Sequence, residues 1–520
     1  MKKIFTLTLI SIYFIINAQV NFKEAYSLYE DENYYIALKQ FKRLYKRNKD
    51  DVKINYYMAM CYLKTDGIKK NALQHLIKVK KSGSDEIPAD IEYQLAKAYF
   101  YNQEFDKAKA IFKSYKENNR ATITTEQIRD INHWVEYCDN AKELMKTPKN
   151  VEFINLGTNI NSRWSEIDPY ITPDGQQLVY TSNKKYISDF MELVSNAYWT
   201  YPEYQNGSEW HKMKSFGKRV NSESNEVVVG MSHSGEKVFI NVRDYLLSDD
   251  IYITSKERKR FTELEGLTKT VNSKFIENGA CFSTNEDTLY FSSNRPGGYG
   301  GLDIYISVKL PDGTWGLPMN LGPEINTKYD DDYPNLSYDG KKLYFASKGH
   351  NSMGGFDVFV SERKAGKWTK PKNLGYPIND LNDNRVIAFT EYPRYAYIAK
   401  SYENGEGYSD IYKMIYKDVP PPAIVYTGNI KVGRSYKPEE LSKYNEDITI
   451  TVTNDKTGEE LEGFQYNKTS KKYVLALKPG KYTIKITGDK YKDLVKKIEV
   501  HDVQPVNIVN QMDLYMQLTQ

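Results

Sequence analysis

Five copies of a short triplet with Asn at its centre constrain the fold more than any other feature of the sequence. They begin at Ile160, Val220, Val271, Ile325 and Ile378, 51 to 60 residues apart. Each copy is followed by short segments in which apolar and polar residues alternate, which is the pattern of β-strands. A period of this size, built from short strands, is typical of a β-propeller whose repeats each form one blade.

Two copies show the start of the repeat most clearly. In one, Asp168-Pro-Tyr-Ile-Thr-Pro-Asp-Gly leads into Leu178-Val-Tyr-Thr-Ser-Asn; in the other, Asp332-Tyr-Pro-Asn-Leu-Ser-Tyr-Asp-Gly leads into Leu343-Tyr-Phe-Ala-Ser. The Asp-Gly pairs predict a two-residue hairpin turn, because glycine accepts the positive φ that such a turn requires. Each repeat is therefore expected to begin with a hairpin.

A third strand is predicted where Asp is followed by two apolar residues, at Asp189, Asp250, Asp303, Asp357 and Asp410. An outer fourth strand is predicted in segments that begin with Trp and end in Asn-Leu-Gly, at 315–322 and 368–375. Four strands complete a blade.

The last repeat lacks a fourth strand, because the chain reaches Val419-Pro-Pro-Pro422 soon after Asp410. The missing signature stands upstream of the first hairpin, in Val151-Glu-Phe-Ile-Asn-Leu-Gly157. We therefore expect a five-bladed propeller over residues 151–418, with this strand closing the ring beside the last blade and leaving no open sheet edge there.

The first residues have the three regions of a secretory signal peptide. Met1-Lys-Lys is basic, Ile4 to Ile16 is apolar, and Asn17-Ala18-Gln19 supplies small and polar residues. Cleavage is expected after Ala18, so residues 1–18 would be removed and the protein exported to the periplasm. No later apolar run approaches the ~20 residues that span a bilayer, and we expect no transmembrane segment in the mature chain.

Charge and cysteine content exclude several classes of protein. The chain has 72 basic and 68 acidic residues, and this balance gives no basic footprint for nucleic acid. Cys61, Cys138 and Cys281 are odd in number and widely spaced, so buried thiols are expected rather than a disulfide framework or a zinc site. A bridge between Cys61 and Cys138 is the alternative.

Residues 19–147 show a helical period instead. Alanines followed by a bulky residue recur as Ala25, Ala37 and Phe41, as Ala59, Ala72 and Leu76, and as Ala96, Ala108 and Phe112. This spacing resembles the tetratricopeptide repeat, in which small residues let paired antiparallel helices approach closely. A further helix from about Thr125 to Met145 is expected to cap the stack, and Pro148 to end it.

Stacked helix pairs present a concave face that commonly binds peptides or partner domains. The candidate partner contacts in this groove are six tyrosines of the helical repeats: Tyr26, Tyr29, Tyr56, Tyr57, Tyr93 and Tyr101. The alternative for each tyrosine is packing between repeats.

The tail is expected to fold separately. Residues 419–423 form a Pro-rich linker, and four alternating segments within 424–520 predict a small β-sandwich. They begin at Ile448, Tyr473, Tyr482 and Val495. In this tail a strand is followed by Leu-Lys-Pro-Gly-Lys-Tyr and then by a second strand. This order resembles the carboxypeptidase-regulatory-like domain, which implies a spacer or interaction module.

Catalytic, cofactor and metal sites are not predicted. Gly230-Met-Ser-His-Ser-Gly235 lacks the last glycine of a nucleophile elbow, and the six histidines occur singly without ligand spacing. The acidic clusters Asp330-Asp-Asp332 and Asp380-Leu-Asn-Asp-Asn384 are interpreted as turn caps, with calcium binding as the alternative. The sequence thus predicts a protein that is not an enzyme and uses no cofactor.

The propeller motifs Pro-Asp-Gly, Leu-Tyr-Phe-Ser-Ser-Asn-Arg and Gly-Gly-x-Asp-Ile-Tyr resemble the PD40 (WD40-like) repeats of TolB-type proteins. The order of signal peptide, tetratricopeptide repeats, propeller and regulatory-like domain is similar to the periplasmic PorE-type components of the type IX secretion and gliding apparatus. That resemblance implies envelope partners, including an outer-membrane protein of the PorP/SprF type, and association with the outer membrane. Such proteins usually end in an OmpA-like domain, which is not among these 520 residues, so peptidoglycan contact is not expected from them.

Two functional hypotheses follow. The first is a non-catalytic periplasmic scaffold that docks envelope proteins through its helical face and its propeller. The second is a ligand-binding module in which the central funnel of the propeller holds a glycan, a muropeptide or a peptide. Aromatic side chains clustered at the mouth of the funnel would favour the second hypothesis.

Overall fold

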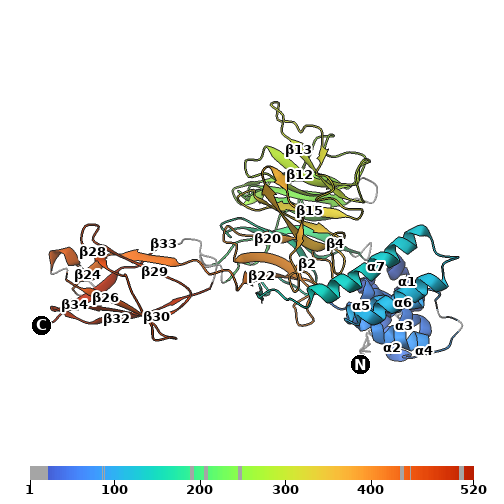
Figure 1. Ribbon diagram of the computed structural model, residues 1–520, viewed down its shortest axis with the longest axis horizontal. Coiled ribbons are helices and arrows are strands. Elements are labelled where there is room, and N and C mark those ends of the chain that lie inside the picture. Colours follow the sequence, from blue (N-terminus) through green and yellow to red (C-terminus); the bar gives the residue numbers. More distant parts are fainter. Residues whose placement is uncertain are drawn as a thin grey trace, which may run out of the picture. The chain divides into compact units, whose positions relative to one another are not determined.

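The computed structural model of the protein describes residues 21–519, apart from 85, 87, 188–191, 204–208, 244–248, 434–438, 445–446 and 503–508. The chain divides into two compact units, Met1–Trp134 and Val135–Gln520. The first is helical and is coloured blue to cyan, and the second is built mainly from β-sheets (Figure 1). The expected signal peptide lies outside the described residues.

Seven α-helices are described. They are α1 (Phe22–Glu30), α2 (Tyr34–Arg47), α3 (Val52–Leu63), α4 (Ala72–Lys81), α5 (Ile91–Tyr101), α6 (Phe105–Asn118) and α7 (Thr125–Leu144). Polar residues set two of the starts, because the Asn21 and Asp51 side chains accept hydrogen bonds from the amides of Glu24 (2.8 Å) and Ile54 (2.9 Å). No described helix is both long and apolar enough to cross a membrane.

The helices of the first unit form two layers. Helix α3 contacts α1 on one side and α5 on the other, while α2, α4 and α6 each pack against the helix before them. The nine positions predicted to hold the helices together are all 0% exposed: Ala25, Ala37, Phe41, Ala59, Ala72, Leu76, Ala96, Ala108 and Phe112. The sequence pattern therefore identified the contact between the layers correctly, because alanine permits the close approach that the bulky residue then fills.

The boundary between the units falls inside α7, earlier in the chain than the expected end of the helical domain at residue 147. Tyr137 and Cys138 are buried within the second unit, and the Asn140 side chain donates a hydrogen bond to the Ser352 carbonyl oxygen (2.9 Å). The C-terminal part of α7 thus belongs to the β-rich unit. Its apolar pattern could not reveal which neighbour buries it.

Five sheets of at least four strands follow along the chain. The first is β2 (Glu166–Ile171), β3 (Leu178–Ile187), β4 (Glu192–Thr200) and β5 (Lys214–Ser215); the second is β6 (Asn225–Met231), β7 (Lys237–Arg243), β8 (Asp250–Glu257), β9 (Arg260–Phe261) and β10 (Glu265–Gly266); the third is β11 (Glu277–Phe282), β12 (Thr288–Ser293), β13 (Asp303–Val308) and β14 (Met319–Asn320). The fourth is β15 (Asp331–Leu336), β16 (Lys342–Ser347), β17 (Asp357–Lys364), β18 (Lys367–Trp368) and β19 (Lys372–Asn373); the fifth is β20 (Ile387–Phe389), β21 (Tyr395–Lys400), β22 (Asp410–Tyr416) and β1 (Val151–Asn155).

These sheets close on themselves as a β-propeller. Strand β4 contacts β6, β6 contacts β11, β11 contacts β15, and β2 contacts β20 and β21 of the last sheet. The Asn335 side chain donates a hydrogen bond to the Ile387 carbonyl oxygen (3.2 Å), which joins the fourth sheet to the fifth. Strand β1 pairs antiparallel with β22, from Val151 opposite Tyr416 to Asn155 opposite Tyr412. This is the position that the sequence predicted for residues 151–157.

The repeated triplet is explained by its asparagine side chain. In the fourth sheet, Asn379 Oδ1 accepts from the Val358 amide (2.8 Å), and its Nδ2 donates to the Val358 carbonyl (2.9 Å) and to Asn373 Oδ1 (2.8 Å). The other four triplets repeat the two backbone contacts through the following residues: Asn161 with Ile411, Asn221 with Ala197, Asn272 with Ile251, and Asn326 with Ile304. Each asparagine bonds the backbone amide of the third strand at the point where the outer strand ends, and it adds a second donor to the carbonyl of the same residue, which also accepts from an outer-strand amide.

Aspartates that start the third strands hydrogen-bond the loops before them, as Asp357 does by accepting from the Met353 amide (2.9 Å). Asp303 accepts from the Gly300 amide (3.1 Å) and the Asn320 side chain (3.1 Å), and Asp357 accepts from the Asn373 side chain (2.7 Å). The predicted third strand at Asp189 lies outside the described residues, and β4 takes that place in the first sheet.

The first hairpins are wider than predicted. Thr172 and Gln177 are joined by a backbone hydrogen bond (3.0 Å), so four residues, not two, form the loop between them. Asp174 accepts from Thr172 Oγ1 (2.6 Å) and from the Gln176 amide (3.0 Å), and this side-chain network stabilises the longer loop. The positive φ of Gly175 (73°) is as predicted.

The C-terminal residues form three four-stranded sheets around one hydrophobic core. Four strands match the predicted segments: β26 (Thr449–Asn454), β29 (Lys472–Leu477), β30 (Gly480–Thr487) and β32 (Leu494–Val500). The others were not predicted; they are β23 (Ile424–Gly428), β24 (Ile430–Val432), β25 (Glu439–Glu440), β27 (Glu460–Leu461), β28 (Tyr466–Asn467), β31 (Tyr491–Lys492), β33 (Val509–Gln511) and β34 (Leu514–Leu518). Several have only two or three residues, which is too short for alternation to be recognised.

Candidate functional site

All six candidate tyrosines lie on one layer of the helical unit. Tyr26 and Tyr29 are on α1, Tyr56 and Tyr57 on α3, and Tyr93 and Tyr101 on α5. These helices contact one another along the layer. The structure thus places every candidate on the same set of helices, although it does not join all six rings in one cluster.

Tyr57 is the centre of the first aromatic cluster. Its ring centroid lies 5.0 Å from that of Tyr26, 5.1 Å from Tyr29 and 5.3 Å from Tyr56. Tyr56 is buried and donates a hydrogen bond to Asp90 Oδ1 (2.7 Å), so packing is its role. Tyr26, Tyr29 and Tyr57 remain half-exposed and can contact a partner.

The other two tyrosines lie farther along the same layer. Tyr93 packs against Phe112 (5.7 Å between ring centroids), and its hydroxyl donates to Asp130. Tyr101 packs against Phe100 (5.3 Å) and Trp134 (6.2 Å). Both tyrosines are half-buried, so part of each ring packs between the helices as the alternative interpretation held.

Lys97 is a site residue that the sequence reading missed. Its ammonium lies 4.4 Å from the ring centroid of Tyr93 and 5.1 Å from that of Trp134, which gives two cation–π contacts. Tyr93, Lys97 and Tyr101 are spaced i, i+4 and i+8 on α5, which places them on one helical face. That spacing could have identified Lys97.

Burial lowers the pKa of Lys97 to about 8, with the Asp130 carboxylate acting in the opposite direction. We expect the ¹³C signal of reductively methylated Lys97 to titrate with a midpoint near pH 8, measured by NMR on the intact protein. Replacing Asp130 by Asn should move the midpoint lower, because the ammonium loses a favourable charge. A midpoint above pH 10 in the unmodified background would contradict the burial of this amine.

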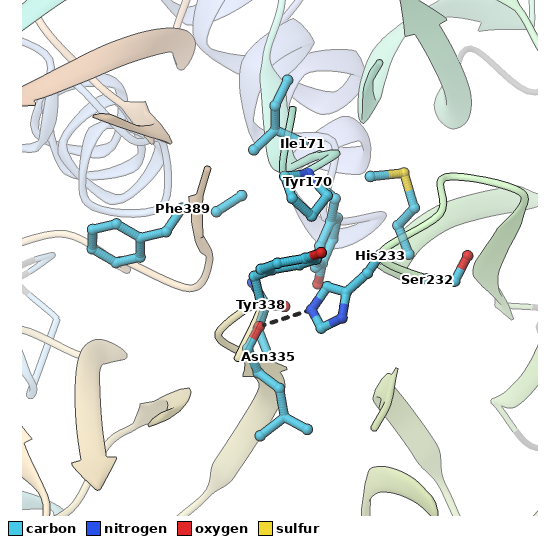
Figure 2. Close-up of a pocket in the computed structure, with 11 residues that line it drawn as sticks. Tyr170, Ile171, Ser232, His233, Asn335, Tyr338 and Phe389 are labelled. Carbon is cyan, nitrogen blue, oxygen red and sulfur yellow. Dashed lines mark hydrogen bonds between the residues drawn. The ribbon is translucent and has the colours of Figure 1, made fainter. Parts of the chain in front are cut away.

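A second candidate site is a narrow pocket at one end of the propeller. Figure 2 shows its lining, which includes the labelled aromatic side chains Tyr170, His233, Tyr338 and Phe389 together with polar Asn335. These residues come from β2, β15 and β20 and from the turns after β6 and β15. The hydroxyl of Tyr170 is buried and has no hydrogen-bond partner among the described residues.

Several residues that line the pocket occupy the same position in the hairpin loops of different repeats. Pro173, His233, Thr284, Tyr338 and Glu391 each directly follow the Ser or Thr that opens the turn, and Pro173, His233 and Tyr338 line the pocket. Comparing this position among the repeats could have identified the site. The closure of the ring decides which of the five side chains meet.

The histidine of this pocket is held by the scaffold. His233 Nε2 lies 3.3 Å from the Leu336 carbonyl oxygen, so this nitrogen carries the proton and donates (Figure 2). Burial lowers the His233 pKa and favours the neutral ring. Ser232, the serine of the incomplete nucleophile elbow, accepts from the Lys237 amide (3.0 Å) and belongs to the turn between β6 and β7.

Acidic residues of the cluster at 330–332 make hydrogen bonds and an ion pair with other residues of the propeller. Asp330 Oδ2 pairs with the Lys348 ammonium (2.8 Å), and Asp332 accepts from the Asn278 side chain (2.6 Å) and the Gly279 amide (3.1 Å). In the part of the chain that is described, no group of three or more His, Cys, Asp or Glu residues could hold a metal ion. Cys61 and Cys281 are buried free thiols, and burial raises the pKa of both to about 12.

Comparison with known proteins gives distant structural likenesses. No protein-family model and no curated protein matches the chain. Among solved structures, TolB from Acinetobacter baumannii is 15% identical, with 57% of this chain and 71% of that chain covered and a TM-score of 0.30. A Trypanosoma rangeli sialidase in complex with the inhibitor DANA is 11% identical, with coverage of 68% and 89% and a TM-score of 0.33. Likenesses this distant do not bear on function, and the propeller assignment rests on the strand pairing.

Proposed function

We propose that this protein is a non-catalytic scaffold of the cell envelope that docks other proteins. In this proposal it consists of tetratricopeptide-type helical repeats, a five-bladed PD40-type propeller and a regulatory-like β-sandwich. The observation that carries it is the placement of the candidate tyrosines on α1, α3 and α5, with Tyr26, Tyr29 and Tyr57 half-exposed around one aromatic cluster. Such rings supply large contact area at low entropic cost.

The cellular setting is part of the same proposal. The basic and apolar segment before Ala18 supports export to the periplasm, and the domain order supports a role in type IX secretion or gliding. The proposed partner is an outer-membrane protein of the PorP/SprF type or another secretion component. Lys97, beside Tyr93, offers a cation to an acidic group of that partner.

Replacing Tyr26 by Ser is expected to reduce partner recovery at least tenfold in pull-downs from cross-linked envelopes, because a half-exposed aromatic anchor is lost. Tyr45→Ser is the matched control, since Tyr45 is also half-buried but lies on α2 in the other layer. Circular dichroism checks that both variants retain their helices. Recovery of no envelope protein by the unmodified chain, or equal loss in both variants, would count against this function.

A second candidate function is ligand binding in the propeller. The specific observation is the aromatic lining of the pocket, where the rings of His233 and Tyr338 lie 5.8 Å apart and the Tyr170 hydroxyl lacks a partner among the described residues. Aromatic faces combined with a few polar groups suit a sugar or a peptide. A thermal-shift screen of sugars and muropeptides tests it: a stabilising ligand whose effect disappears in Tyr338→Ala supports the pocket, and no stabilisation argues against it.

A further inference from the structure

The pocket at one end of the propeller has an uncharged lining. Among the described residues that line it, none is Asp, Glu, Lys or Arg. The His233 imidazole is one titratable group of the lining, and burial lowers its pKa, which favours the neutral ring. Burial also raises the pKa of Tyr170 well above its usual value, so its hydroxyl stays protonated. The pocket therefore offers polar atoms without a charge.

The Tyr170 hydroxyl is a polar group without a partner in this pocket. Tyr170 is only 2% exposed, and its hydroxyl has no hydrogen-bond partner among the described residues. Figure 2 shows the side chains of Tyr170, His233 and Tyr338 converging on the pocket. Because buried polar groups nearly always have a partner, an orphaned hydroxyl at a pocket indicates the place of a ligand group.

His233 supplies a second polar atom. Its Nε2 donates to the Leu336 carbonyl oxygen (3.3 Å), so Nδ1 of the neutral ring keeps a lone pair that can accept a hydrogen bond. The Tyr170 hydroxyl can both donate and accept. A hydroxyl group of a ligand also has both capacities, and it can therefore satisfy the two protein groups together.

Tyr338 adds an exposed aromatic ring. This residue is 54% exposed, its ring lies 5.8 Å from the ring of His233, and its carbonyl oxygen accepts from the Thr284 hydroxyl (3.2 Å). The ring is thus attached to a bonded turn and open to a ligand. One face of a pyranose ring presents C–H groups that pack against such a ring, while its hydroxyls require hydrogen-bond partners.

The pocket is also narrow. Its empty space is about 350 Å³ with the open mouth included, so the enclosed part holds only a small group. A terminal sugar unit meets this condition, because it can insert one hydroxyl or hydroxymethyl group and leave its ring at the mouth. A helix or a folded domain cannot enter such a space.

We propose that this pocket binds one uncharged sugar unit of a glycan. A hydroxyl of the sugar bonds the Tyr170 hydroxyl and His233 Nδ1, and the C–H face of the sugar packs against Tyr338. The inference rests on the second candidate function, ligand binding in the propeller, and narrows the ligand class to neutral sugars.

Charged ligands fit this lining less well. A uronic acid or a muropeptide carries carboxylates, and an amino sugar carries an ammonium group, but the described lining has no opposite charge to pair with either. Burying an unpaired charge is costly. The Asp168 and Asp332 carboxylates lie close enough to raise the pKa of Tyr170, and they would repel an anion that entered. The charged terminus of a short peptide meets the same lack of a partner.

The test is a set of saturation-transfer-difference NMR titrations of the intact protein. The probes are sugars of glucose, galactose and mannose configuration, each as the neutral methyl glycoside, the uronic acid and the 2-amino sugar, together with muramyl dipeptide. Tyr170→Phe removes only the unpartnered hydroxyl, and Tyr338→Ala removes the exposed ring. Tyr180→Phe is the first control, because Tyr180 is buried in the same sheet and its hydroxyl donates to the Ile160 carbonyl (3.4 Å). Glu391→Ala is the second, since Glu391 has the turn position of Tyr338 but is not among the described lining residues.

We expect saturable binding of at least one methyl glycoside and at least tenfold weaker binding of its uronic acid and amino counterparts. Tyr170→Phe and Tyr338→Ala should each weaken that binding at least tenfold, whereas the two controls should leave it unchanged. Tyr170→Phe should also leave the melting temperature of the free protein unchanged or raise it, because a buried hydroxyl without a partner is removed.

Three results would overturn the inference. Preferred binding of a uronic acid, an amino sugar or muramyl dipeptide would do so, but ligand binding in the propeller would stand if Tyr338→Ala abolished it. A lower melting temperature of Tyr170→Phe would show that the hydroxyl already has a partner in the free protein. Absence of binding by every probe would reject both this inference and the second candidate function, while the envelope pull-down tests the scaffold independently.

Discussion

Replacing Asn379 by Ala is expected to lower the free energy of unfolding of the propeller by about 1 to 3 kcal/mol, which is the usual cost of leaving one buried backbone group without its hydrogen bond. Asn379 is 0% exposed, and its side chain satisfies both the amide (2.8 Å) and the carbonyl (2.9 Å) of Val358. Alanine leaves the Val358 amide without a partner and removes the contact with Asn373 (2.8 Å), while the Val358 carbonyl keeps the Leu374 amide as a donor (3.1 Å). The same argument applies to the asparagine of every triplet.

Cys281 is a convenient reporter for this measurement. Its thiol is buried in β11, and burial raises its pKa to about 12, so it reacts with a thiol reagent only when the propeller opens. Pulse labelling in urea, followed by mass spectrometry of the Cys281 peptide, gives the midpoint for the propeller separately from the helical unit. Asn285→Ala is the control: Asn285 lies in an exposed turn, and a loss below about 1 kcal/mol is expected there. Equal losses in the two variants would mean that the buried contacts of Asn379 contribute little.

The second large effect is the pH dependence of stability caused by Asp331. This carboxyl group is 0% exposed, and burial raises its pKa to about 7, although Thr327 donates to it from its amide (2.5 Å) and its hydroxyl (3.0 Å). At the equivalent positions of two other sheets, a buried unpaired carboxyl group is avoided. Glu277 is paired with Arg295 (3.0 Å), and the fifth sheet has the uncharged Asn384.

The sign of the effect follows from the raised pKa. Between the unfolded value of 3.8 and about 7, the folded state retains a proton that the unfolded state has lost, so stability falls as pH rises through this window. Its full contribution is present below pH 3.8. The total change is at most about 4 kcal/mol, at roughly 1.4 kcal/mol per pKa unit.

Asp331→Asn removes this titration and installs the residue type that the fifth sheet uses. We expect the variant to be more stable than the unmodified protein at pH 8, by up to about 4 kcal/mol, and the advantage to shrink as pH falls to 4. Cys281 labelling of both proteins at each pH measures the difference, because the pH dependence of the reagent cancels in the ratio. An advantage that stays constant from pH 4 to pH 8 would show that Asp331 is not the titrating group.

Much of the propeller could be predicted because the same structural position occurs once in each repeat, so that the residues at that position can be compared with one another. The triplet asparagines and the aspartates that begin the third strands recur at fixed offsets, since each makes the same local hydrogen bonds in its blade. The last sheet lacked an outer strand in sequence, and β1 supplies it. Hairpin width was missed because Asp174 bonds its own loop, a contact that the Asp-Gly pair alone does not reveal.

The candidate site residues were harder to predict from the sequence than the propeller repeats. The alanine spacing indicates which helices carry the six tyrosines, but it does not show which tyrosine rings are buried by packing and which are exposed. Tyr56 is buried and donates a hydrogen bond to Asp90, whereas the adjacent Tyr57 is half-exposed. The two differ because successive residues of a helix lie on different faces of it and pack against different neighbours. The spacing of Lys97 from Tyr93 could have indicated their contact, but the contact of the Lys97 ammonium with Trp134 depends on how α5 packs against α7, which no spacing within α5 reveals.

The sequence by itself determined the repeat units: paired helices joined through alanines, and blades defined by Asn triplets, because these features depend on neighbours at fixed chain separation. Only the tertiary structure decided what those units bring together. Ring closure places Tyr170, His233 and Tyr338 in one pocket. Such contacts join residues from different repeats, and their meeting depends on how the blades pack, which no spacing within one repeat encodes.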